Sequence, residues 1–170
     1  RDRNIFIVGT ALAINNTWEE ILEDYQIDFY RIRKREDIKR VQRGQIVLLT
    51  INLLTELKRE MKKLLRIRCQ KVMLIFDESD AITNGSSKRT KAMLSVFRKC
   101  RYKVLATGTL TRNNVVEAAP QLELLYNNSI HYLAKNEWIY RFKNGQMEKN
   151  RNFFLNQPFP AYKRGYELFS

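Results

Sequence analysis

Three carboxylates that directly follow a short apolar run are the residues best suited to chemistry in this sequence. The apolar run spans residues 72–76, and the acids are Asp77, Glu78 and Asp80. One carboxylate of such a pair can hold Mg²⁺ through its hydration shell, while its neighbour orients a water that attacks a phosphate. The same pattern also fits a strand that ends in a solvated acidic turn. The pattern of the neighbouring strands and helices is needed to distinguish these interpretations.

The apolar run predicts a buried strand that positions the acids. Runs this short and this apolar are typical of strands covered on both faces of a parallel sheet. Other such runs lie at residues 4–8, 45–50 and 103–107, and a weaker one lies at 27–32. Helical patterns separate them, which predicts an α/β fold with a doubly wound, mainly parallel sheet. In such sheets ligands bind beyond the carboxyl ends of the strands, where the acids lie.

Polar residues at the starts of the helical patterns predict helix caps. Asn15, Asn16 and Thr17 precede a pattern at 18–25, and a serine pair precedes one at 88–99. A basic amphipathic helix is predicted over residues 52–66, with its apolar stripe on the sheet. After a further pair of caps, Asn113 and Asn114, Pro120 is predicted to kink the last helix or split it in two.

The charge of the chain favours a polyanionic partner. Lys and Arg number 31 against 18 acids, a net charge of +13. Residues 31–43, 58–71 and 88–103 hold seven basic residues each. Any one cluster fits a solvated helix face, but three of them on so basic a chain predict binding to nucleic acid by phosphate neutralisation.

The remaining composition indicates a cytoplasmic protein that does not enter a membrane. The 170 residues, 44% of them apolar, suffice for one domain, and no apolar run is long enough to span a bilayer. Cys69 and Cys100 lie far apart and predict reduced thiols, and His131 has no second histidine with which to bind zinc. The missing initiator Met suggests a piece of a longer polypeptide, whose bacterial or mobile-element origin is a guess.

Aromatic residues gather in the last part of the chain. Ten of the 19 aromatic residues follow Asn127, mixed with Asn, Lys and two prolines. Rings between basic residues can stack on bases, but packing is their commoner use. We predict an irregular extension over residues 127–170 whose rings pack back on the domain.

The order of the motifs resembles a known family. An Asp-Glu-Ser-Asp box at 77–80, a Ser-Lys-rich helix, a Thr-Gly-Thr turn at 107–109 and an Asn-Asn pair succeed one another between residues 72 and about 126. This series is similar to superfamily 2 helicase-like ATPases, especially the SWI/SNF (chromatin-remodeller) branch. Residues 4–10, with Trp18, resemble motif Ia of that family, and residues 46–50 resemble motif Ib.

The resemblance implies a fold and a set of roles. Residues 1–126 would form part of the first RecA-like lobe, a P-loop NTPase lobe without its phosphate-loop segment, and 127–170 would extend the same lobe. Asp77 would hold Mg²⁺ through water, and Glu78 would position the attacking water. The remaining implied roles are coupling of ATP state to a second lobe (Asp80, Thr107, Gly108, Thr109) and nucleic-acid binding (Thr10, Thr50, Lys88, Arg89).

Departures from the family limit what these residues can do alone. The sequence contains no glycine-rich loop with Lys and Thr to cradle phosphates, and Leu110 replaces the usual Pro after Thr-Gly-Thr. The second RecA-like lobe with its arginine finger is also missing. We therefore expect ATP and Mg²⁺ to bind in the full-length parent. We expect the fragment alone to hold neither of them tightly and to be inactive. Without a neighbouring phosphate-loop strand, the strand at 103–107 would have an exposed edge that promotes self-association.

Two other functions remain open. The chain fits a basic α/β module that binds nucleic acid without ATP chemistry, in which case the acids only end a strand. It also fits, less well, a restriction-type subunit built on the same motor. The first interpretation, a fragment of a helicase or double-stranded-DNA translocase, accounts for more of the motifs.

Overall fold

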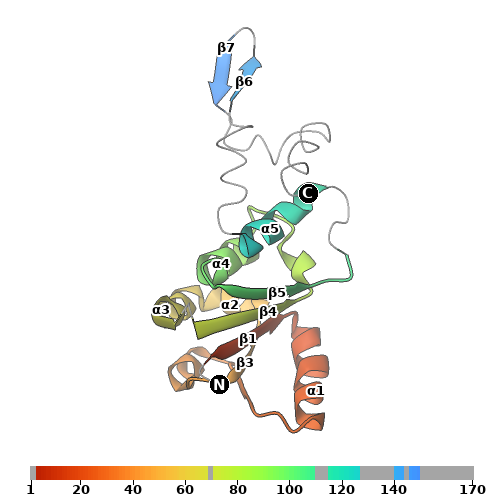
Figure 1. Cartoon of the computed structure of the whole chain (residues 1–170), viewed down its shortest axis with the longest axis vertical. Coiled ribbons are helices and arrows are strands. Elements are labelled where there is room, and N and C mark those ends of the chain that lie inside the picture. Colours follow the sequence, from red (N-terminus) through yellow and green to blue (C-terminus); the bar gives the residue numbers. More distant parts are fainter. Residues whose placement is uncertain (1–2, 69–70, 110–114, 127–139, 144–145, 150–170) are drawn as a thin grey trace.

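A five-stranded parallel sheet with helices on both faces forms the body of the protein (Figure 1). The computed structural model describes residues 3–68, 71–109, 115–126, 140–143 and 146–149. The strand order is β2-β3-β1-β4-β5, and every neighbouring pair is parallel. The prediction of a doubly wound parallel sheet is confirmed. The strands are β1 (Asn4–Gly9), β2 (Phe29–Arg31), β3 (Ile46–Thr50), β4 (Val72–Asp77) and β5 (Tyr102–Ala106).

The helices form two layers of unequal size. On one face, Ile14 and Leu22 pack on Ile7 and Leu48 of the sheet. These two residues come from a continuous helical segment made of the π-helix η1 (Ala13–Trp18) and α1 (Glu19–Asp24). The opposite face carries the larger core, under α2 (Ile51–Glu56), α3 (Lys58–Arg68) and α4 (Lys88–Phe97). The short elements are η2 (Arg35–Arg40), η4 (Ser79–Ile82), η5 (Val115–Ala118) and α5 (Ala119–Leu125).

Strand β4, which lies between β1 and β5, is covered unequally on its two faces. Val72, Leu74 and Phe76 are fully buried under the larger helical layer, whereas Met73 and Ile75 are only half-buried. The prediction that this run is buried on both faces is therefore wrong for one face. The reason is the placement of η1 and α1, whose buried side chains pack on β1 and β3.

Helix boundaries confirm some predicted caps and correct others. Ser87 accepts a hydrogen bond from the Thr90 amide at 3.1 Å, as a cap should. Residues 15–17 are not caps but lie inside a helical segment that begins at residue 11. The helix predicted over 52–66 is two helices, because Leu57 separates α2 from α3. Pro120 lies in the first turn of α5, next to η5, which confirms the predicted split; Asn113 and Asn114 lie outside the described residues.

A hairpin lies in the stretch for which we predicted irregular structure. Strands β6 (Tyr140–Lys143) and β7 (Gln146–Lys149) pair antiparallel in a separate two-stranded sheet. In the sequence, Asn144 and Gly145 stand between them, and Asn-Gly is a strong signal for a two-residue hairpin turn. The prediction of irregular structure is therefore wrong for these residues, because the dipeptide favours a hairpin even within a stretch of mixed composition.

Neither a membrane-spanning helix nor a cluster of metal ligands is present in the described part of the chain. None of its helices combines the length and the apolar character that crossing a bilayer requires. Nor do three His, Cys, Asp or Glu side chains gather there into a metal-binding group. Cys100 is buried, and the positions of Cys69 and His131 lie outside the described residues.

Strand β5 forms one edge of the sheet. Among the described residues it pairs only with β4, so its outer backbone groups have no strand partner. Tyr102 and Val104 expose 36% and 46% of their surfaces beside that edge. An unpaired, apolar edge strand is a template for pairing with another chain.

We expect the 170-residue chain to self-associate through this edge and Val104→Lys to reduce the association, because a lysine on an edge strand opposes strand pairing. Light scattering coupled to size-exclusion chromatography, over a range of protein concentrations, measures the mass of the associated species. Leu12→Lys, at an exposed helical residue, is the matched control. An equal reduction by both substitutions, or a wild-type chain that stays monomeric throughout, would contradict the prediction.

Candidate functional site

Parallel pairing brings the predicted site residues to one edge of the sheet. Gly9, which precedes Thr10, pairs with Thr50, and Asp77 pairs with Ala106, which precedes Thr107. Because all five strands run the same way, these four chain segments end side by side. This edge, defined here as the carboxyl edge, is where ligands bind in open α/β sheets.

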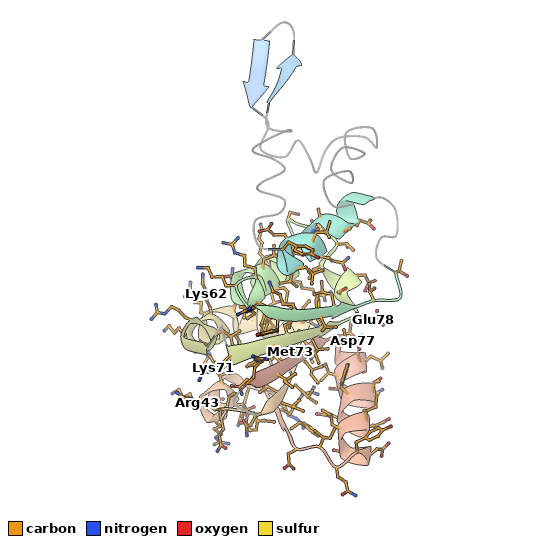
Figure 2. All side chains as sticks on the ribbon, viewed as in Figure 1. Arg43, Lys62, Lys71, Met73, Asp77 and Glu78 are labelled. Carbon is orange, nitrogen blue, oxygen red and sulfur yellow. The ribbon has the colours of Figure 1, made fainter. Side chains whose placement is uncertain are left out.

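Asp77 is held in place by two hydrogen bonds. The indole Nε1 of Trp18 donates to its Oδ2 at 2.9 Å, and the amide of Glu78 donates to its Oδ1 at 2.9 Å. Figure 2 shows Asp77 and Glu78 where β4 ends, near the helical segment that carries Trp18. Each carboxylate oxygen accepts only one of these bonds and keeps a lone pair for another partner. The half-buried carboxylate is therefore oriented and still able to bind.

Trp18 is a site residue whose role the sequence analysis did not identify. The sequence predicts Trp18 on the helix after β1, but no local pattern links it to Asp77, which lies 59 residues away. It is the last residue of the π-helix η1, and π-helical turns are rare and frequent at functional sites. The available signal was chemical, since a half-buried tryptophan usually finds an acceptor for its N–H.

We expect Trp18→Phe to lower the free energy of unfolding by about 1 kcal/mol, because it removes a hydrogen bond to a charged group and keeps an aromatic ring in place. Chemical denaturation of Trp18→Phe, Asp77→Ala and the double variant measures the coupling between them. Strictly additive effects in that cycle would show that the two side chains do not interact in solution.

Glu78 has an unusual backbone conformation. Its φ and ψ are 53° and 52°, in the left-handed helical region. A residue other than glycine pays roughly 1–2 kcal/mol there, and such strain is concentrated at functional sites. The side chain is exposed at the carboxyl edge and has no hydrogen-bonding or ionic partner among the described residues. Its carboxylate is therefore free to act on a ligand.

We expect Glu78→Gly to leave the free energy of unfolding unchanged or to raise it by up to about 1 kcal/mol, because glycine adopts this conformation without strain. Glu20→Gly, at an exposed position of α1, should instead lower it by about 1 kcal/mol. Thermal and chemical denaturation of both variants test the contrast. Equal destabilisation by the two would contradict the left-handed conformation.

The rest of the acidic box contacts α5. Ser79 is fully buried, and its hydroxyl donates to Oε1 of Gln121 at 2.8 Å. Asp80 is half-buried in the first turn of η4. The box is therefore linked to α5 through Ser79.

The Thr-Gly-Thr turn is stabilised from within. Thr107 Oγ1 accepts a hydrogen bond from the Thr109 amide at 3.1 Å and donates to the Thr109 carbonyl at 3.0 Å. Gly108 and Thr109 are exposed, and a Cβ added at Gly108 would meet nothing within 4 Å. The turn lies one strand away from Asp77, because Asp77 pairs with Ala106.

The four residues predicted to bind nucleic acid have different structural roles. Thr10 Oγ1 accepts from the Ala13 amide at 3.2 Å and Thr50 Oγ1 from the Leu53 amide at 3.3 Å, so both threonines cap helices. Lys88 and Arg89 are exposed in the first turn of α4. Positive charge there opposes the helix dipole, and an anion bound beside it would offset that cost.

Some residues of the basic clusters have structural partners. Arg31 donates to Glu19 at 2.9 Å, and burial lowers the pKa of Arg31. Lys103 Nζ donates to the carbonyls of Leu124 at 2.6 Å and Arg98 at 2.8 Å, and burial lowers the pKa of Lys103. These two cations pair within the fold, so counts of Lys and Arg overestimate the charge available to a partner.

The carboxyl edge fits one part of an Mg²⁺–nucleotide site. The oriented Asp77 suits a water-mediated contact to Mg²⁺, and the exposed Glu78 suits contact with a water. Mg²⁺ keeps several waters of its hydration shell and commonly uses only one or two protein carboxylates, so a single oriented aspartate suits it.

Comparisons with known proteins agree with this geometry. A model of the SNF2-related domain matches residues 3–154. A solved structure, the Sulfolobus solfataricus SWI2/SNF2 ATPase core in complex with double-stranded DNA, is similar with a TM-score of 0.57 and 21% identity. The likeness covers 75% of this chain and 26% of that one, so the chain spans about a quarter of its length, and it confirms the RecA-like α/β fold. A search of curated proteins found no match.

Proposed function

Because the chain belongs to the SNF2-related domain family, we propose that it forms part of the first lobe of a nucleic-acid-dependent ATPase. One observation carries the proposal: the acidic box, the Thr-Gly-Thr turn and the two threonines follow parallel strands that end at one edge. The solved structure similar to this chain is a SWI2/SNF2 ATPase core bound to double-stranded DNA. We accordingly propose a helicase-like motor that translocates on double-stranded DNA.

In this proposal the two acids divide the chemistry of hydrolysis. Asp77, held by Trp18, binds the hydrated Mg²⁺, which neutralises charge on the phosphates. Glu78 has an exposed carboxylate in a strained turn one residue later, and it orients the attacking water. The hydrogen bond from the Glu78 amide to Asp77 fixes the position of one acid relative to the other.

The neighbouring segments couple the nucleotide to the rest of the motor. Thr107, Gly108 and Thr109 form a compact turn beside Asp77 and face toward a second RecA-like lobe in the parent chain. Asp80 belongs to the same coupling region, since the box that contains it is tied to α5 through Ser79.

Nucleic acid binds along the same edge. Lys88 and Arg89 pair with phosphates, while Thr10 and Thr50 place the helix starts that they cap next to the backbone. Main-chain amides at those helix starts donate to phosphate oxygens, as helix N-termini commonly do.

The 170 residues would not hydrolyse ATP alone. Their sequence has no glycine-rich phosphate loop, and they span about a quarter of the similar ATPase core. We propose that ATP and Mg²⁺ bind in a longer cytoplasmic polypeptide, whose second lobe contributes an arginine finger.

ATP turnover by that longer polypeptide, with and without duplex DNA, tests the proposal. We expect DNA-stimulated turnover that Glu78→Gln lowers at least about 100-fold, since the residue orients the attacking water. Glu20→Gln makes the same charge change at an exposed helical position and should leave turnover within about twofold, because substitutions at exposed surface positions usually have small effects.

Two outcomes would overturn the proposal. Robust turnover by residues 1–170 alone that depends on Glu78 would show that the phosphate loop is dispensable. Salt-sensitive DNA binding by the longer polypeptide, without turnover and unaffected by Glu78→Gln, would show a basic binding module in which the acids only end a strand.

A further inference from the structure

A groove with a volume of about 650 Å³ lies between α3 and α4, on the outside of the larger helical layer. Six basic side chains line its walls: Lys58, Lys62 and Arg66 from α3, Lys91 from α4, and Arg98 and Lys99 from the turn that follows α4. We call it the basic groove. It lies along the helices, whereas Asp77 and Glu78 lie where β4 ends, and Figure 2 shows Lys62 well separated from both acids.

The cations of the basic groove have few partners within the fold. Of the six, only Arg98 forms an ion pair among the described residues, to Glu123 at 3.8 Å. Arg31 and Lys103, in contrast, donate hydrogen bonds inside the protein. Placing five unpaired cations around one groove costs repulsion, which a polyanionic occupant would offset.

The spacing of these cations matches a helix. Lys58, Lys62 and Arg66 are four residues apart on α3, so they form a row with steps of about 6 Å along the axis. On the other wall, Lys91 lies on α4 and Arg98 caps the end of that helix. Carboxylates four residues apart on another helix repeat with the same step. On a helix that lies along the groove, each carboxylate would therefore lie opposite one cation of α3.

The floor of the basic groove is apolar. Leu65 and Val96 are buried beneath it, and the half-buried Leu94 borders it. Phosphates cannot use such a floor, and a DNA duplex is too wide to enter a groove between two packed helices. An amphipathic helix uses both features, because its apolar stripe covers the floor while its acids face the walls.

We propose that the basic groove binds an acidic amphipathic helix of a partner protein, with its leucine-like side chains on Leu94 and its carboxylates on the lysine row of α3. The proposal concerns a surface away from the carboxyl edge and needs neither ATP nor catalysis. Its failure is therefore distinguishable from failure of the ATPase proposal.

Binding of a designed peptide to the 170-residue chain tests this inference. The probe is a fluorescein-labelled peptide of about 20 residues, long enough to form a helix, with Glu at every fourth position beside a Leu stripe. We expect Lys62→Glu to weaken its binding about tenfold in fluorescence anisotropy, because reversal replaces attraction by repulsion. Lys63→Glu makes the same change at an exposed α3 residue outside the groove and should weaken binding less than about twofold.

Two further measurements separate the groove from general charge attraction. Leu94→Ala should also weaken binding, and the same peptide with Gln for Glu should bind at least about tenfold less tightly. Circular dichroism establishes that each variant keeps the fold. Equal effects of Lys62→Glu and Lys63→Glu, or no effect of Leu94→Ala in a folded variant, would overturn the proposal. Loss of binding to a short DNA duplex in Lys62→Glu, with peptide binding unchanged, would instead assign the groove to nucleic acid.

Discussion

Parallel pairing of β1 with both β3 and β4 is the constraint on which the rest of the structure depends. The pairing sets Gly9 opposite Thr50 and Val8 opposite Phe76, so the segments that leave these strands start from one edge. Parallel strands need a crossover between them, and the crossovers place helices over the faces. The same constraint thus gathers polar residues at the carboxyl edge and gives α3 and α4 their positions above the core.

The hydrogen bond between Trp18 and Asp77 links a helix that covers one face of the sheet to the carboxyl edge. It ties the helical segment after β1 to the end of β4 across the sheet, and it orients a carboxylate that would otherwise rotate. The adjacent Glu78 stores strain in a left-handed turn. The two neighbouring acids are therefore held differently: the side chain of Asp77 accepts a hydrogen bond from Trp18, whereas the side chain of Glu78 has no partner among the described residues and its backbone occupies a costly conformation.

Sequence reasoning found what depends on local pattern. Apolar runs located the strands, and the residues that follow them located the edge where Asp77 and Thr107 lie. The π-helical turn that brings Trp18 to Asp77 was missed, because it depends on packing between segments 59 residues apart. The half-buried face of β4 was missed for a similar reason, since a run of apolar residues does not show how far the helices above it extend. The hairpin was missed although its Asn-Gly signal was present.

The sequence also does not show which of its charged residues are available to a ligand. The count of +13 correctly identifies a basic protein, yet it does not distinguish Lys103, whose ammonium group binds the carbonyls at the end of α5, from Lys62, which has no such partner among the described residues. Only the fold separates cations that stabilise it from cations available to a ligand. Among the described residues, such cations lie at the start of α4 beside the carboxyl edge and along the groove between α3 and α4, and others, such as Lys63, are exposed elsewhere. Because α4 contributes to both of these places, a partner in the groove would contact the helix whose first turn carries Lys88 and Arg89, and an anion bound at one place would alter the electrostatic cost of binding at the other.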